Sequence, residues 1–155
     1  MLPDPNPDGY YHDQDGEIDV MEELGQQPTI DEVHYLQDGG NLGIADNTGV
    51  DLSQGFHDYA VNWQPGKIDY YLDGKLVWSV NQSPTVPEYL ILNLAVGKAG
   101  TWAGGPGPTT PTSATMQVDY VRVWQNVPEP ASASLAMGLI IPMLSRRSRR
   151  RAGEA

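Results

Sequence analysis

Hydrophobic and polar positions alternate along much of the chain with a period of two residues, which is the period of a β-strand. In residues 57–63, large side chains occupy the odd positions and small or polar ones occupy the even positions. Two further runs, 67–72 and 75–80, flank Asp73-Gly74, a dipeptide that favours a two-residue hairpin turn. The pattern therefore predicts short antiparallel strands.

Other segments also have strand character. Residues 17–22, 32–37 and 115–125 interleave β-branched or aromatic residues with polar ones. Residues 89–96, "YLILNLAV", are almost continuously apolar, as expected of a central strand that is covered on both faces. Turns rich in Gly, Pro and Asn separate these segments, and convincing amphipathic helices are absent. The sequence therefore predicts an all-β sandwich.

The net charge of the chain limits the kinds of molecule that it can bind. The formal net charge is −11, and five of the nine Lys and Arg residues lie within 146–151, so the rest of the chain is more acidic still. Nucleic-acid binding requires clustered cations that contact phosphates, and we therefore exclude it as a function of the body. Neutral ligands such as sugars remain open. The chain has no cysteine, which excludes a disulfide framework and thiolate chemistry.

Three carboxylates are close together in "EIDVME", and we call Glu17, Asp19 and Glu22 the acidic strip. In a regular strand Glu17 and Asp19 share a face while Glu22 points to the other. One extra residue, a β-bulge around Val20-Met21, would return Glu22 to the shared face. Mutual repulsion would then keep a proton on one carboxyl group as a general acid, while another stays ionised as a nucleophile.

Two other interpretations apply to this spacing. A solvated acidic strand is favoured by the spacing alone, because short patterns recur by chance. A metal site is the least favoured, since the loop glycine and ligand spacing of a calcium loop are missing.

Further motifs bear on this choice. The "EIDVME" stretch resembles the catalytic signature of glycoside hydrolase family 16, in the bulged form of its laminarinase-like and agarase-like members. Four landmarks follow in the order of that family: "GFHDYAVNWQPGKIDYYLDGKLV", "YLILNLAVG", "GTWAG" and "VDYVRVW". The resemblance covers essentially Met1 to Gln125. It implies a concanavalin-like jelly-roll β-sandwich, with residues 1–126 as the catalytic domain, and it favours catalysis over a solvated strand.

The resemblance implies a retaining endo-glycosidase that acts on a β-linked polysaccharide such as a β-1,3-glucan, with no cofactor required. Glu17 would be the nucleophile, Glu22 the general acid/base, and Asp19 the group that tunes their charge. The alternatives are a non-catalytic glucan-binding module, an inactive fragment of such an enzyme, or a purely structural envelope protein.

Other positions matched to the family imply substrate contacts. His34 and Asn93 would be polar sugar contacts, and Trp102 would provide an apolar face for a pyranose ring. Core packing or loop hydrogen bonding is the alternative role of these three side chains. Asp119 resembles a position that helps to hold a structural calcium in some members. His57 is assigned to structure.

The chain departs from the family pattern in two places. Gly97-Lys98 stands where the family usually has two glycines, so the adjoining loop is expected to differ. The strands that precede the catalytic one in the family are missing, and "MLP" looks like the end of such a strand. We therefore expect a carboxy-terminal part of the domain, incomplete at its N-terminus. The start of the chain also lacks the layout of a signal peptide, which we attribute to truncation.

Residues 127–155 differ in composition from the rest of the chain. They run from Pro-Glu-Pro through an apolar stretch to the Arg cluster. The stretch is shorter than the roughly 20 residues that a helix needs to cross a bilayer. A disordered basic tail is one interpretation. The order of the three parts also resembles a PEP-CTERM sorting signal, which implies a sorting protease as partner, transient membrane contact, and export to the cell envelope or the extracellular space.

Overall fold

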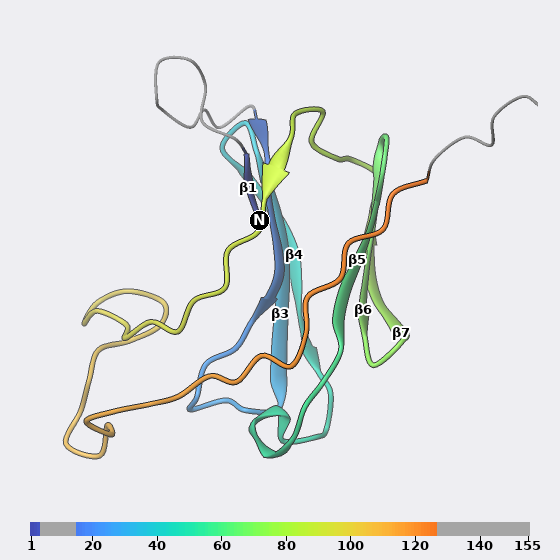
Figure 1. The fold of residues 1–155 in the computed structure, drawn as a ribbon. Helices are drawn as coiled ribbons and strands as arrows, with labels where there is room; N and C mark the ends of the chain where they lie inside the picture. The colour runs from blue at the N-terminus through green and yellow to red at the C-terminus, as the bar shows by residue number, and fades with distance from the viewer. Residues whose placement is uncertain (4–14, 127–155) are drawn as a thin grey trace, which may run out of the picture. The chain divides into compact units, whose positions relative to one another are not determined.

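The computed structural model describes residues 1–3 and 15–126, and this part of the chain is all-β (Figure 1). Its strands are β1 (Leu2–Pro3), β2 (Glu17–Glu22), β3 (Ile30–Gln37), β4 (Gly40–Asn47), β5 (Tyr59–Gln64), β6 (Lys67–Leu72), β7 (Lys75–Val80) and β8 (Glu88–Tyr89). A short 3₁₀ turn, η2 (Leu52–Gln54), follows β4. None of the helices in this part of the chain is long and apolar enough to cross a membrane. The predicted sorting tail, 127–155, lies outside the described residues.

The strands form antiparallel sheets in the order β2-β3-β4 and β5-β6-β7, and β1 pairs with β8. The predicted hairpin at Asp73-Gly74 is confirmed, with φ of 50° and 75° at the two turn residues. The turn between β3 and β4 has the same form, with φ of 53° at Asp38 and 72° at Gly39. Positive φ at both central residues matches the turn to the twist of the flanking strands.

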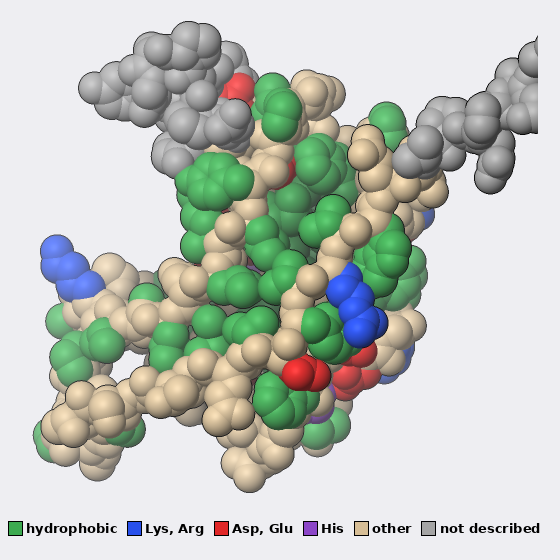
Figure 2. All heavy atoms as spheres, in the orientation of Figure 1, with side chains coloured by type: hydrophobic (Ala, Val, Ile, Leu, Met, Phe, Trp, Pro, Cys, Tyr) green, Lys and Arg blue, Asp and Glu red, His purple; other side chains and the backbone are tan. Residues whose placement is uncertain are grey.

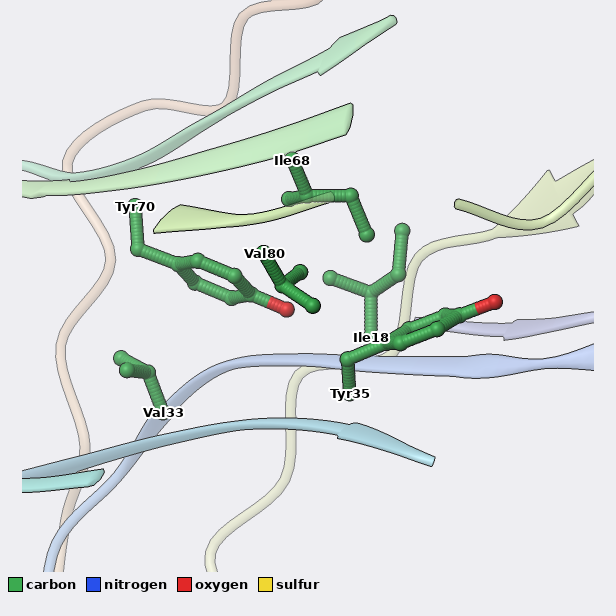
Figure 3. Packing of buried hydrophobic residues seen from close by; sticks show 6 residues of the cluster. All are labelled: Ile18, Val33, Tyr35, Ile68, Tyr70 and Val80. Atoms are coloured by element: carbon green, nitrogen blue, oxygen red, sulfur yellow. The ribbon is translucent and has the colours of Figure 1, made fainter. Parts of the chain in front are cut away.

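A hydrophobic core lies between the two three-stranded sheets. Figure 3 shows its residues pointing toward one another: Ile18, Val33 and Tyr35 from β2 and β3, and Ile68, Tyr70 and Val80 from β6 and β7. The Tyr70 hydroxyl also links the sheets by donating a hydrogen bond of 2.8 Å to the carbonyl oxygen of His34. Full burial of each such side chain contributes about 1.5–3 kcal/mol. This burial fixes which face of β2 and β3 points inward and which points outward.

Two of the expected strands are not formed. Of 89–96 only Tyr89 lies in a strand, the short β8, and 115–125 contains none. Leu92, Leu94 and Val96 are exposed, and hydrophobic side chains gather on the face of the molecule shown in Figure 2. Apolar residues become a strand only where a neighbouring ladder accepts their backbone hydrogen bonds, and beyond Tyr89, which pairs with Leu2 of β1, no strand of the described part pairs with these segments.

The strand β4 was not predicted, because "GNLGIADN" contains two glycines and lacks clear alternation. It forms as the second arm of the hairpin that begins with β3, and all eight of its residues pair with that strand. The chain divides into two compact units, Met1–Asp119 and Tyr120–Ala155. The strands and the acidic strip all belong to the first unit.

Candidate active site

The predicted bulge in β2 is present. Asp19 pairs with His34 and Glu22 pairs with Glu32, so three steps along β2 correspond to two steps along β3. The extra residue lies between Asp19 and Glu22, where the sequence places Val20-Met21. An extra residue of this kind shifts the alternation of side chains by one position. Each side chain after it lies on the opposite face of the sheet from the one a regular strand would give it.

The bulge brings the whole acidic strip to one face of the sheet. Ile18 is buried in the core, so its neighbours Glu17 and Asp19 point outward. On β3 the buried residues alternate with Glu32 and His34, which therefore also point outward. Because paired residues of antiparallel strands share a face, Glu22 lies on the side of Glu32, and Asp19 lies on the side of His34.

The three carboxyl groups influence one another's protonation. Burial raises the pKa of Glu17, and the neighbouring charge of Asp19 raises it further. Burial also raises the pKa of Asp19, with repulsion from Glu22 as the next cause. The side chains of Glu17 and Asp19 share a hydrogen bond, which requires a proton on one of them. The pair thus holds a proton at a pH where free carboxyl groups have lost theirs.

Glu22 is the third carboxyl group, and its pKa is also raised. Burial is the largest cause; the charges of Glu32 and Glu17 add to it, while the charge of His34 opposes it. An upward shift of the pKa is the direction that general acid catalysis requires of a carboxyl group.

His34 lies beside the acidic strip, and both of its ring nitrogens have partners. Nδ1 is 2.8 Å from Oδ1 of Asn41, and Nε2 is 3.4 Å from Oε2 of Glu32. Burial lowers the pKa of His34, but the hydrogen bonds to Asn41 and Glu32 and the charges of the acidic strip outweigh it, so that the net shift is upward.

The other predicted site residues are not gathered in the same way. Asn93 and Trp102 lie outside the strands on exposed stretches, and neither side chain makes a hydrogen bond, ion pair or ring contact with another described residue. Asp119 is exposed, and residues 1–3 and 15–126 contain no group of three or more His, Asp or Glu side chains that could hold a metal. Calcium is also bound by backbone carbonyl oxygens and by water, so the calcium role of Asp119 stays a prediction.

Comparison with known proteins identifies the family of this acidic face. The sequence profile of Glycosyl hydrolases family 16 matches residues 6–122, which is most of the chain. The chain belongs to glycosyl hydrolase family 16. Its all-β architecture of antiparallel sheets agrees with the jelly-roll sandwich expected of that family.

Several curated proteins are similar to this family 16 chain. It is 37% identical over 135 residues to "Glucan endo-1,3-beta-glucosidase A1" of Niallia circulans, covering 71% of this chain and 19% of that protein. It is 36% identical over 114 residues to a "Beta-glucanase" of Acetivibrio thermocellus, covering 71% and 33%. It is 33% identical over 145 residues to a "Beta-glucanase" of Rhodothermus marinus, covering 81% and 50%. The chain thus spans a fifth to a half of the length of these relatives.

Three residues next to the acidic strip of the family 16 chain were not predicted from its sequence. Glu32 and Asn41 are the partners of His34, and Gly43 pairs with His34 across the β3–β4 ladder. The spacing of Glu32 and His34 on one strand could have indicated that they share a face. Asn41 and Gly43 had no such signal, because β4 itself was not apparent in the sequence.

Proposed function

We propose that this family 16 chain carries the catalytic residues of a retaining endo-glycosidase that hydrolyses a β-linked polysaccharide, with a β-1,3-glucan as its substrate. The bulge between Asp19 and Glu22 is the observation that carries this proposal, since it gathers three carboxyl groups with raised pKa values on one face. Such a group of carboxyls can supply both the acid and the nucleophile that glycoside hydrolysis requires.

In the proposed reaction, Glu22 protonates the leaving glycosidic oxygen while Glu17 attacks the anomeric carbon. The bond from that carbon to the leaving oxygen breaks, and a glycosyl ester with Glu17 forms. Water, deprotonated by Glu22, then hydrolyses the ester. Glu17 can attack only when ionised. The hydrogen bond between the two side chains raises the pKa of Glu17 and lowers that of Asp19, so the shared proton must leave Glu17 before the attack. The role of Asp19 is therefore to switch the charge of the nucleophile.

The choice of substrate rests on the named relatives. One is called a glucan endo-1,3-beta-glucosidase and others are called beta-glucanases, so a β-glucan is the first polysaccharide to test. Within this proposal Trp102, which is 54% exposed, provides a face for a pyranose ring, and Asn93 provides a polar contact. His34 is the third proposed sugar contact, through a ring that is already held by Asn41 and Glu32.

We further propose that the strands described here are the carboxy-terminal part of a larger sandwich. The apolar residues 90–96 support this, because they are exposed and have no strand partner within the described part. The tail, 127–155, would act as a PEP-CTERM sorting signal that is read by a sorting protease after transient membrane contact, and the protein would be exported to the cell envelope. Support for this lies in the order of its Pro-Glu-Pro, apolar and Arg-rich parts.

The test measures release of reducing sugar from laminarin, a β-1,3-glucan, by the full chain. Glu22→Gln should lower the rate by about 10²–10⁴-fold, since it removes the proton donor. Glu17→Ala should abolish turnover while binding of laminarin persists. Added azide should restore cleavage by attacking the anomeric carbon in place of Glu17. The product is then a glycosyl azide without a reducing end, so this cleavage is followed by chromatography of the shortened chains.

The matched control is Glu23→Gln. This residue follows Glu22 directly, but the charges that act on it are those of Asp51 and His57 and not those of the acidic strip. Its rate should equal that of the unaltered chain. Full activity of Glu17→Ala without azide would refute the proposal.

A glucan-binding module is the second candidate function. The exposed Trp102 favours it, because a ring platform can hold a sugar without turnover. Binding of laminarin by the unaltered chain, with no release of reducing sugar, would decide for this candidate.

A further inference from the structure

A fourth carboxylate lies on the acidic face. Glu32 stands directly across the ladder from Glu22, with its Oε2 3.4 Å from Nε2 of His34. Both side chains are mostly buried, with exposed fractions of 17% for Glu32 and 20% for His34. Glu32 therefore lies between a candidate acid and a base, where its own charge acts on both.

The imidazole of His34 is held in place from the neighbouring strand. Gly43 lies beneath the ring: a Cβ atom at Gly43 would be 2.9 Å from Cγ and 3.1 Å from Nδ1 of His34. The ring nitrogens face the amide oxygen of Asn41 and the carboxylate of Glu32. Both of these oxygens accept hydrogen bonds, and only the protonated ring can donate from both nitrogens. With these two oxygens as acceptors, the arrangement favours the imidazolium form.

We propose that Glu32 and His34 are positioning residues that act as a charge-regulating pair, in which Glu32 keeps His34 protonated and the two together set the pH at which Glu22 loses its proton. This inference rests on the proposed function. It gives Glu32 a role that the acidic strip alone does not require, since hydrolysis needs only an acid and a nucleophile.

The charges around the pair are few. On the β2 side, the Glu32–His34 pair faces Asp19 and Glu22. The charges of Glu17 and of the amino group of Met1 also affect the pKa values of these carboxyl groups. On the β4 side, the pair faces the neutral residues Asn41, Gly43 and Ala45. The charge of His34 favours the ionised form of Glu22, whereas the charge of Glu32 favours its protonated form. The two members of the pair thus act on Glu22 in opposite directions.

The experiment follows the basic limb of the pH profile of kcat/KM on laminarin, which reports loss of the proton from the acid of the free enzyme. Removing the positive charge with His34→Gln should move this limb to higher pH. Adding Glu32→Gln in that background removes repulsion and should move it back to lower pH. Glu32→Gln alone should move it less, because weaker protonation of His34 offsets the lost repulsion. Glu23→Gln is the control and should leave the limb unchanged.

A second measurement does not depend on turnover. The titration of the His34 ring, followed by NMR in the full chain, should fall to lower pH in Glu32→Gln and stay unchanged in Glu23→Gln. An unchanged His34 titration in Glu32→Gln, or an unmoved limb in a folded His34→Gln variant, would overturn the inference. If His34→Gln does not fold, the titration decides alone. If the unaltered chain is inactive but the His34 titration shifts as expected in Glu32→Gln, the proposed hydrolysis is refuted while the interaction between Glu32 and His34 is supported.

Discussion

Asp31 offers a direct test of the physical reasoning, because one oxygen of its buried carboxyl group has no hydrogen-bond partner among the described residues. The residue is 1% exposed, and the oxygen without a partner in the described part is Oδ1. Burial, together with repulsion from Asp46 across the ladder and from Glu23, raises its pKa from 3.8 to about 7. The folded protein therefore binds this proton more tightly than the unfolded chain does.

The sign of the effect follows from linkage. The contribution of Asp31 to stability is fully present below its unfolded pKa near 3.8, falls as pH rises toward about 7, and is constant above that value. The difference is about three pKa units, which corresponds to roughly 4 kcal/mol at most. Asp31→Asn cannot ionise and should escape this loss. Its buried amide has a polar cost of about 1–3 kcal/mol, but that cost does not depend on pH.

The assay is urea denaturation of the full chain and the Asp31→Asn variant at pH 4 and at pH 8. The stability of the variant relative to the unaltered chain should rise by roughly 4 kcal/mol or less between the two pH values. Asp69→Asn is the contrasting control: hydrogen bonds from Lys67 and Ser79 lower the pKa of Asp69 below 3.8, so its stabilising contribution is lost only below that pH. The loss of stability in this variant should therefore be nearly the same at pH 4 and at pH 8. The same Asp31→Asn difference at both pH values would refute the reasoning.

Two further variants test the support of the site. Gly43→Ala places a Cβ 2.4 Å from the carbonyl oxygen of Val33 and 2.9 Å from Cγ of His34, so it should lower both the melting temperature and kcat; an unchanged pH profile and full activity would count against the close packing of the ring. Tyr70→Phe removes the donor of the 2.8 Å bond to the His34 carbonyl and should cost about 1–3 kcal/mol in denaturant unfolding, with Tyr71→Phe as the control.

The sequence predicted the strands whose two faces differ in polarity. Residues 17–22, 67–72 and 75–80 match β2, β6 and β7, because one face of each must be apolar to build the core and the turn residues mark their ends. The bulge was predicted from chemistry rather than from periodicity: without it Glu22 has no reason to accompany Glu17.

The features that the sequence could not predict depend on which strands lie next to each other in the sheets. The apolar run 89–96 has strand composition, yet composition cannot supply the adjacent ladder that a strand requires, and in the described part that ladder is missing. The Asp38-Gly39 dipeptide is the same hairpin signal as Asp73-Gly74 and could have indicated a turn after β3. The residues of β4 that follow it have no hydrophobic period, because their place depends on pairing with β3. The link between Glu32 and Glu22 likewise requires the pairing register, which a one-residue bulge decides.

In β2 and β3, the same alternation of side chains determines both the packing of the core and the position of the candidate catalytic carboxyl groups. Ile18, Val33 and Tyr35 are at most 1% exposed, and the residues between them carry the charged face. Burial of the inner face therefore holds like charges together on the outer face, where they would otherwise separate. Burial raises the pKa of Glu22, and the repulsion from Glu32 and Glu17 adds to it. Loosening of the core should therefore relax the carboxyl groups before the sheet itself unfolds.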